Sequence, residues 1–121
     1  MRAKYEKLRV WMESMDLVEQ VYQASRTFPR RENFGLTSQI RRAAVSVSAN
    51  IAEGCGRYHT REFIHFLYTS RGSLFELMTL LDLSARLKYL AETEYAVLRE
   101  KCEGILAGLS ALVHSLEAKM Q

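Results

Sequence analysis

The chain has 121 residues, of which 48% are hydrophobic and 26% are charged, a composition typical of one globular domain and not of a disordered chain. One proline and six glycines are too few for the many turns of an all-β fold, no apolar run approaches the ~20 residues of a membrane span, and the basic start lacks the apolar core of a signal peptide. The net charge of +3 is too small to indicate a ligand by itself.

Helical periodicity dominates the sequence and predicts four helices. The first covers about residues 10–28, and Pro29 ends it because the residue before a proline disfavours the helical conformation. The second covers about residues 37–54. Gly54 and Gly56 stand at its end, where a left-handed C-terminal residue is common.

The second predicted helix contains a stretch that alternates like a strand, VSVSANI, but the alanines on both sides favour helix and no partner strand is evident. Thr37 or Ser38 is the expected N-cap. At 100° per residue the helix has one apolar face, one face of small residues and one polar stripe between them. The small residues are Val45, Ala49 and Ala52.

The third helix is predicted over about residues 60–89 and the fourth over about 93–118, where apolar residues step by three and four without a break. Thr93 is the expected N-cap of the fourth helix. Gly104 and Gly108 lie four residues apart in that helix and predict a close approach to another helix, since each glycine costs roughly 1 kcal/mol relative to alanine.

Short connections make neighbouring helices antiparallel. The predicted fold is therefore all-α, an antiparallel up-down-up-down four-helix bundle that forms a single domain over residues 1–121.

The stretch FPRRENFGLTSQIRRAAVSVSANIAEGCGR, followed by EFIHFLYTSRGSLFEL, closely resembles the bacterial four-helix-bundle proteins associated with 23S ribosomal RNA intervening sequences. The resemblance covers nearly the whole chain; Ser48 and residues 68–71 depart mildly from the family pattern. It implies the bundle fold and assembly into a ring, most simply a homopentamer, as in the similar accessory proteins of diversity-generating retroelements. The family brings no catalytic residues, and nucleic-acid binding is the leading suggestion for its role.

The polar stripe of the second helix predicts a subunit contact, because polar groups on a helix flanked by neighbours must pair with one another or with another chain. Glu53 and Arg57 are spaced to pair on the helix. Arg42 needs a carboxylate from elsewhere, for which Glu76 is the candidate. The predicted contact residues are Gln39, Arg42, Ser46, Asn50, Glu53, Arg57 and Glu76.

A second interpretation is contact with RNA or DNA, because arginines at helix ends can neutralise phosphates without reading sequence. Residues 1–61 carry 11 basic and 6 acidic side chains, whereas residues 62–121 carry 6 and 8. Of the aromatic rings that single-strand binders use for stacking, only Tyr58 and His59 stand among these arginines. The candidate contacts are Arg26, Arg30, Arg31, Arg41, Arg57 and Arg61.

An enzyme is the least favoured interpretation. The three histidines, His59, His65 and His114, have no metal-ligand spacing, and Cys55 and Cys102 match no metal or redox motif, so we expect reduced thiols in a cytoplasmic protein. We therefore predict no catalytic residue, metal, cofactor, small-molecule substrate or membrane partner. The predicted function is a non-enzymatic oligomeric protein for binding or scaffolding, with nucleic acid as the candidate ligand; the alternative is a purely structural or protein-interaction module.

Overall fold

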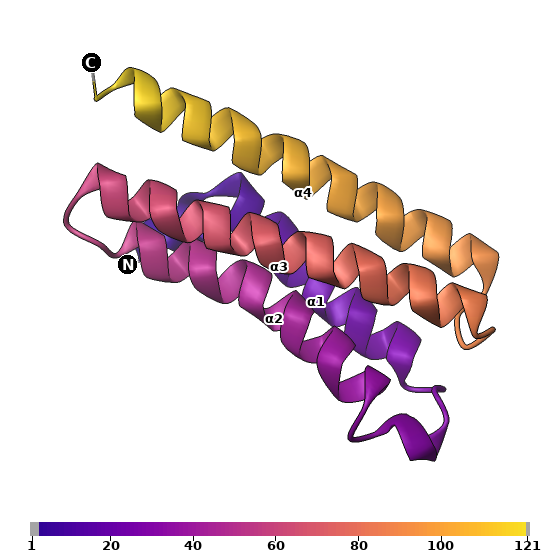
Figure 1. The fold of residues 1–121 in the computed structure, drawn as a ribbon. Helices are drawn as coiled ribbons and strands as arrows, with labels where there is room; N and C mark the ends of the chain where they lie inside the picture. The colour runs from indigo at the N-terminus through magenta and orange to yellow at the C-terminus, as the bar shows by residue number, and fades with distance from the viewer. Residues whose placement is uncertain (1–2, 121) are drawn as a thin grey trace.

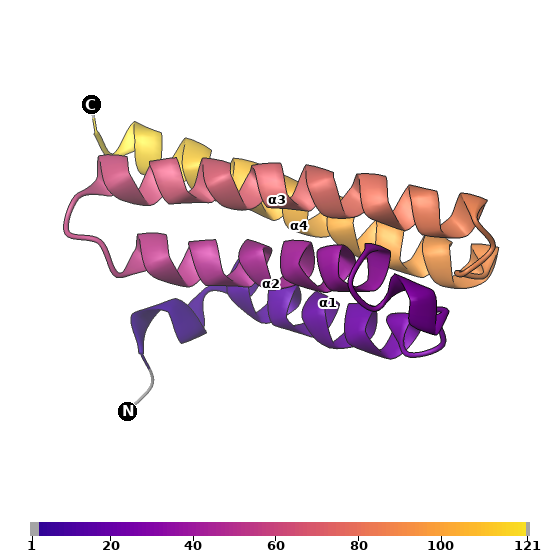
Figure 2. The same cartoon turned by 60° about the horizontal axis from the view of Figure 1, so that its bottom comes forward.

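The computed structural model describes residues 3–120, which form four long helices joined by short connections (Figure 1). The helices are α1 (Arg9–Ser25), α2 (Leu36–Cys55), α3 (Thr60–Arg86) and α4 (Glu92–Ala118), and the 3-10 turns η1 (Lys4–Lys7) and η2 (Arg30–Glu32) precede α1 and α2. Consecutive helices pack against each other and α1 packs against α4, which closes the bundle. In Figure 2, α3 and α4 form one layer over α1 and α2. The predicted up-down four-helix bundle is confirmed.

The core is a continuous apolar cluster to which every long helix contributes residues. These residues recur every three or four positions, because that spacing places them on one face of a helix. Within it, α2 and α3 form the most extensive of the helix pairs. A buried hydrogen bond also joins them, because the Ser70 hydroxyl of α3 donates to the Val47 carbonyl of α2 at 2.7 Å. Side chains buried almost completely include Leu17, Ile40, Ile51, Leu67, Leu74, Leu77, Leu81, Ile105 and Leu109.

Helix α1 is shorter than its periodicity predicted. It ends at Ser25, whereas the prediction extended to Phe28. The Ser25 hydroxyl donates to the Val21 carbonyl at 2.7 Å, so a side chain takes over part of the hydrogen bonding in the last turn. Phe28 is buried outside the helix and packs on the Tyr89 ring, with the two centroids 5.6 Å apart. Phe28, which continues the helical spacing of apolar residues, therefore anchors the loop after α1 and is not part of the helix.

Helix α2 begins earlier than predicted, and its start is capped by a side chain from outside the helix. Gly35 is the N-cap, and Thr37 is a buried residue inside the first turn, so neither Thr37 nor Ser38 caps the helix. The Glu32 carboxylate accepts the Leu36 N–H at 3.2 Å. An acidic group at this position is favourable because the first backbone N–H groups of a helix lack intrahelical partners.

The turn between α3 and α4 also differs from the predicted boundaries. Helix α3 ends at Arg86, before the predicted end near residue 89, because Lys88 adopts a positive φ of 65°. Helix α4 begins at Glu92 with Ala91 as its N-cap, so the predicted cap at Thr93 is wrong. The Glu94 carboxylate accepts the Ala91 N–H at 3.4 Å.

Gly54 lies inside α2 and not in a left-handed C-cap, which corrects the prediction for this position. Gly56 is the C-cap, with a right-handed φ of −81°. Gly54 is needed for a different reason: a Cβ atom there would lie 2.6 Å from Cβ of Phe66 and 3.0 Å from Cδ1 of Phe63. The glycine therefore lets α2 and α3 approach each other closely.

The two glycines of α4 differ from each other. A Cβ atom at Gly108 would lie 2.6 Å from Cγ1 of Val10 in α1, which confirms a close approach there. At Gly104 nothing lies within 4 Å of the added Cβ atom, so the predicted packing role is wrong for that glycine.

Candidate interaction surfaces

The middle of the polar stripe of α2 faces α3 and forms a small hydrogen-bonded network with it. The Asn50 amide donates to the Ser46 carbonyl at 2.8 Å and to the Ser46 hydroxyl at 3.0 Å. The Ser46 and Ser73 hydroxyls lie 2.8 Å apart, which extends the network to α3. All three side chains belong to half-buried residues, so water still reaches them. Ser46 and Asn50, which belong to the stretch that alternates like a strand, thus join α2 to α3.

The end of the stripe near the α2–α3 loop is neutralised within the chain. Arg57 and Glu53 form the predicted ion pair, with a nitrogen–oxygen distance of 2.7 Å. The Arg57 guanidinium also lies over the Phe66 ring, 4.7 Å from its centroid. Because the pair is exposed to water, its contribution to stability is small. Its effect is to fix the Arg57 side chain against α3.

The other end of the stripe is exposed and unpaired. Gln39, Arg42 and Glu76 are exposed side chains. Within residues 3–120 no ion pair joins Arg42 to Glu76, and neither residue has a hydrogen-bond partner. The intramolecular pairing of these two groups is therefore not formed, and both charges remain available to another chain.

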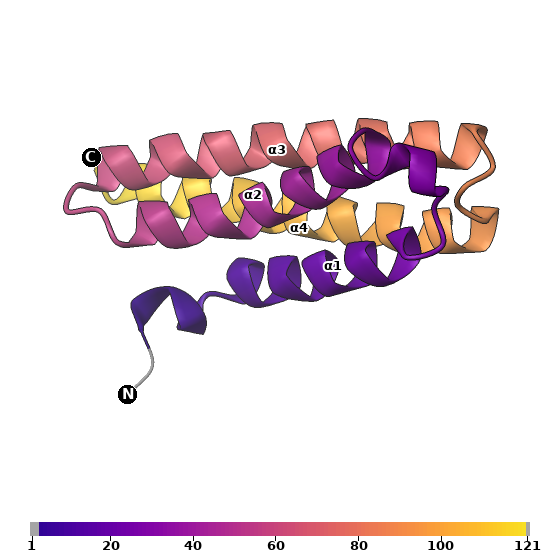
Figure 3. The ribbon, with the colours of Figure 1, turned by 90° about the horizontal axis from the view of Figure 1, so that it is seen from below.

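The arginines singled out for nucleic-acid contact do not form one cluster. Arg26, Arg30, Arg31 and Arg41 lie at the end of the bundle that carries the α1–α2 loop, whereas Arg57 and Arg61 flank the α2–α3 loop at the other end (Figure 3). Arg41 lies in α2, and Arg57 follows the end of this helix, sixteen residues later. This separation corresponds to about 24 Å along the helix axis. The structure thus divides the predicted set into a group of four and a group of two.

Arg41 is held by neutral groups. Its guanidinium lies over the Tyr22 ring, 4.6 Å from the centroid. Its Nε donates to the Ser25 hydroxyl at 2.9 Å and its Nη2 lies 3.5 Å from the Tyr22 carbonyl. No carboxylate among residues 3–120 forms an ion pair with it. The side chain is positioned without being neutralised.

Arg31 is placed in a similar way by the α3–α4 turn. Its Nη2 lies 3.5 Å from the Tyr89 hydroxyl, and its guanidinium is 6.0 Å from the centroid of that ring. The Tyr89 hydroxyl donates to Glu32 at 3.0 Å. Tyr89 therefore links η2 to the α3–α4 turn and fixes the loop that carries the arginines.

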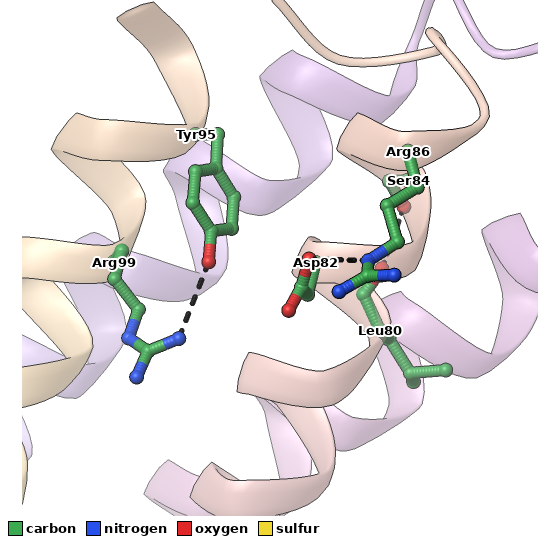
Figure 4. A network of polar contacts seen from close by, with 6 residues as sticks. All are labelled: Leu80, Asp82, Ser84, Arg86, Tyr95 and Arg99. Atoms are coloured by element: carbon green, nitrogen blue, oxygen red, sulfur yellow. Dashed lines mark hydrogen bonds and ion pairs between the residues drawn. The ribbon is translucent and has the colours of Figure 1, made fainter. Parts of the chain in front are cut away.

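Two further arginines, Arg86 of α3 and Arg99 of α4, are paired with carboxylates on their own helix. Arg86 bonds Asp82 at 3.1 Å, and Arg99 lies 3.7 Å from Glu103. Figure 4 shows the Arg86–Asp82 pair and the Arg99 guanidinium directed at the Tyr95 hydroxyl, 3.2 Å away, with the Ser84 hydroxyl donating to the Leu80 carbonyl nearby. These contacts neutralise Arg86 and Arg99, whereas Arg61 and Arg71 of α3 form no ion pair among residues 3–120.

Phe34 is the functional candidate that sequence reasoning missed. It follows η2 in the same loop as Arg30 and Arg31, and its exposed fraction is 101%. We name the residues at this end the basic end surface: Arg26, Arg30, Arg31, Phe34 and Arg41. The available signal was an aromatic residue directly before Gly35 in a loop, which predicts exposure only weakly.

The two cysteine thiols are buried, and their reactivity is low. Burial raises the pKa of the Cys102 thiol to about 12, and burial also raises that of Cys55. Both therefore stay protonated at neutral pH, which makes them poor nucleophiles. Among residues 3–120 there is no group of three or more histidine, cysteine, aspartate or glutamate side chains placed to hold a metal ion.

The arrangement defines the class of the protein as an antiparallel four-helix bundle with a polar network between α2 and α3 and an arginine-rich loop at one end. Residues 6–111 match the family of 23S rRNA-intervening sequence proteins, and the chain belongs to this family.

A crystal structure from Bacteroides thetaiotaomicron, described as a protein of unknown function from the S23 ribosomal protein family, has the same fold. The TM-score is 0.77 at 21% identity, and the match covers 86% of this chain and 97% of that one. No curated protein sequence matches the chain significantly. None of the helices in the part of the chain described by the structure is long and apolar enough to cross a membrane.

Proposed function

We propose that the protein is a non-enzymatic homo-oligomer, a ring of five chains, that acts as a binding or scaffold protein. The observation that supports this best is the exposed end of the α2–α3 stripe, where Arg42 and Glu76 carry opposite charges and have no partner among residues 3–120. Charged groups at a subunit interface select the register and the partner more than they add affinity.

The Ser46–Asn50–Ser73 network supports the same proposal. It fixes the relative position of α2 and α3 beside the unpaired charges. A rigid two-helix surface loses little conformational entropy on association. The small side chains Val45 and Ala49 lie beside the stripe on the exposed side of α2 and allow another helix to approach closely.

Charge reversal at Arg42 tests the subunit contact. Because Arg42 is exposed, Arg42→Glu leaves the fold intact. We expect light scattering to report a smaller particle for this variant than for the parent protein. Arg9→Glu is the matched control, since the Arg9 side chain is 88% exposed and its one ion pair within the described residues 3–120 is with Glu13 on the same helix. An unchanged mass for Arg42→Glu, or an equal loss in both variants, excludes the stripe as the subunit contact.

Contact with RNA or DNA is the second candidate function, and the basic end surface favours it. Four arginines lie there without an ion-pair partner among residues 3–120. In a ring, each chain contributes one such surface, so a weak contact is multiplied. Binding through phosphates requires an affinity that falls steeply with salt. Salt-independent binding, or none, leaves a purely structural or protein-interaction role.

A further inference from the structure

Phe34 combines nearly complete exposure with arginines on both sides in the sequence. Its exposed fraction is 101%, whereas the apolar residues next to this loop, Phe28 and Leu36, are each only 7% exposed. A single exposed apolar side chain is not unusual. Its surroundings make this one informative, because Arg30 and Arg31 precede it by four and three residues, respectively.

The four arginines of the basic end surface are not neutralised by carboxylates among residues 3–120, and two of them are held in place by aromatic rings. Arg26 and Arg30 are exposed and form no ion pair within residues 3–120. Arg31 and Arg41 lie against tyrosine rings, which orient a guanidinium without neutralising it. These groups carry the free positive charge that binds phosphates.

The acidic groups at this end of the bundle restrict where a polyanion can lie. Glu32 is the one carboxylate of the α1–α2 connection, and it is already bonded to the Leu36 N–H and the Tyr89 hydroxyl. Glu92 and Glu94 begin α4 at the same end of the bundle and repel phosphates there. A bound strand is therefore directed over the α1–α2 loop.

We propose that the basic end surface binds single-stranded nucleic acid, with one base stacked on the Phe34 ring and the neighbouring phosphates on the four arginines. This deepens the nucleic-acid candidate above and rests on it. A single strand is required because the bases of a duplex are stacked on each other and cannot lie on a side chain. Stacking on an aromatic ring tolerates any base, so the site selects strandedness and not sequence.

Nucleic acid fits this surface better than a protein partner does. An acidic peptide would also meet the arginines, but it offers no array of planar groups for an exposed ring. A single strand offers both anions for the guanidiniums and flat bases for the exposed ring. A protein partner, including a second copy of this chain, is an outcome that the experiment below detects.

The test measures fluorescence anisotropy with labelled 20-nucleotide oligo(dT) and oligo(U), and with a hairpin duplex of the same length. We expect both single strands to bind more tightly than the duplex. Phe34→Ala should weaken single-strand binding roughly 5- to 150-fold, the effect of removing one stacked base. Phe34→Tyr keeps the ring and should retain binding. Comparison of the two single strands separates RNA from DNA as the preferred ligand.

Tyr58→Ala is the matched control, because Tyr58 is 98% exposed in the loop at the opposite end of the bundle. This variant should bind as tightly as the parent. Arg30→Glu should weaken binding and lower the slope of log affinity against log salt by about 0.7, whereas Arg9→Glu should not. Circular dichroism and light scattering establish that each variant is folded and has the parent mass.

The outcomes separate this proposal from the one it rests on. If Phe34→Ala and the parent bind single strands equally, with a steep salt dependence, the protein binds nucleic acid but not by stacking on Phe34. If Phe34→Ala changes the mass of the particle instead, the surface is a protein contact. If none of the three probes binds, both the stacking site and the nucleic-acid function are wrong.

Discussion

Replacing Gly54 with alanine tests whether α2 and α3 are packed as closely as the structure indicates. In an exposed helix interior, glycine to alanine stabilises by about 1 kcal/mol. At Gly54 the added Cβ atom would lie 2.6 Å from Cβ of Phe66 and 3.2 Å from the Phe63 carbonyl oxygen. Both atoms are on or next to the α3 backbone, so they cannot move aside as the end of a long side chain can.

The steric cost should therefore reach the upper part of the 1–3 kcal/mol range for overpacking, about 3 kcal/mol. After subtraction of the helix-propensity gain, we expect Gly54→Ala to lower the free energy of unfolding by about 2 kcal/mol. Gly104→Ala is the matched control, since nothing lies within 4 Å of its added Cβ atom. It should raise the free energy of unfolding by about 1 kcal/mol.

Urea unfolding followed by circular dichroism measures both changes, provided that the slope with denaturant is unchanged. The two variants should differ by about 3 kcal/mol with opposite signs. If Gly54→Ala is as stable as Gly104→Ala, the close contact of α2 with α3 is not present in solution and the reasoning is refuted.

Three further predictions concern local groups. Glu32→Ala removes the acceptor of the Leu36 N–H and should lower the free energy of unfolding by about 1 kcal/mol; an unchanged urea midpoint contradicts the cap. Ser70→Ala removes the buried hydrogen bond to the Val47 carbonyl, which keeps its partner within α2, and should cost about 0.5–1.5 kcal/mol in the same assay. Thr79→Ala on the exposed face of α3 should cost under about 0.5 kcal/mol. Burial raises the Cys102 pKa from 9.0 to about 12, so the folded protein binds this thiol proton more tightly than the unfolded chain does. The free energy of unfolding should therefore fall as pH rises from about 9 to 12. Cys102→Ala should remove part of that fall in urea unfolding, and identical pH profiles for the variant and the parent would show that the thiol pKa is not raised.

The fold was predictable because it depends on the period of buried residues, which the sequence displays directly. The heptad-like spacing around Leu74 and Leu109 identified the core positions, and both residues are buried. Helix ends were less predictable because tertiary contacts set them. Phe28 continues the helical period but packs on Tyr89 from the far turn, and Glu32 caps α2 from outside the helix.

The interaction surfaces were predictable only where they depend on spacing along one helix. The Glu53–Arg57 pair follows from its separation of four residues. The contact between Ser46 and Ser73 depends on the register of α2 against α3, and the separation of Arg41 from Arg57 depends on the length of α2. The exposure of Phe34 depends on how the loop is held by Tyr89, which no local pattern records.

The mass of the parent protein in solution tests the central claim most directly. Light scattering coupled to gel filtration, at micromolar concentration and physiological salt, should give a particle about five times the 14.0 kDa of one chain. A mass equal to that of a single chain under these conditions contradicts the assembly and removes the role proposed for the α2–α3 stripe.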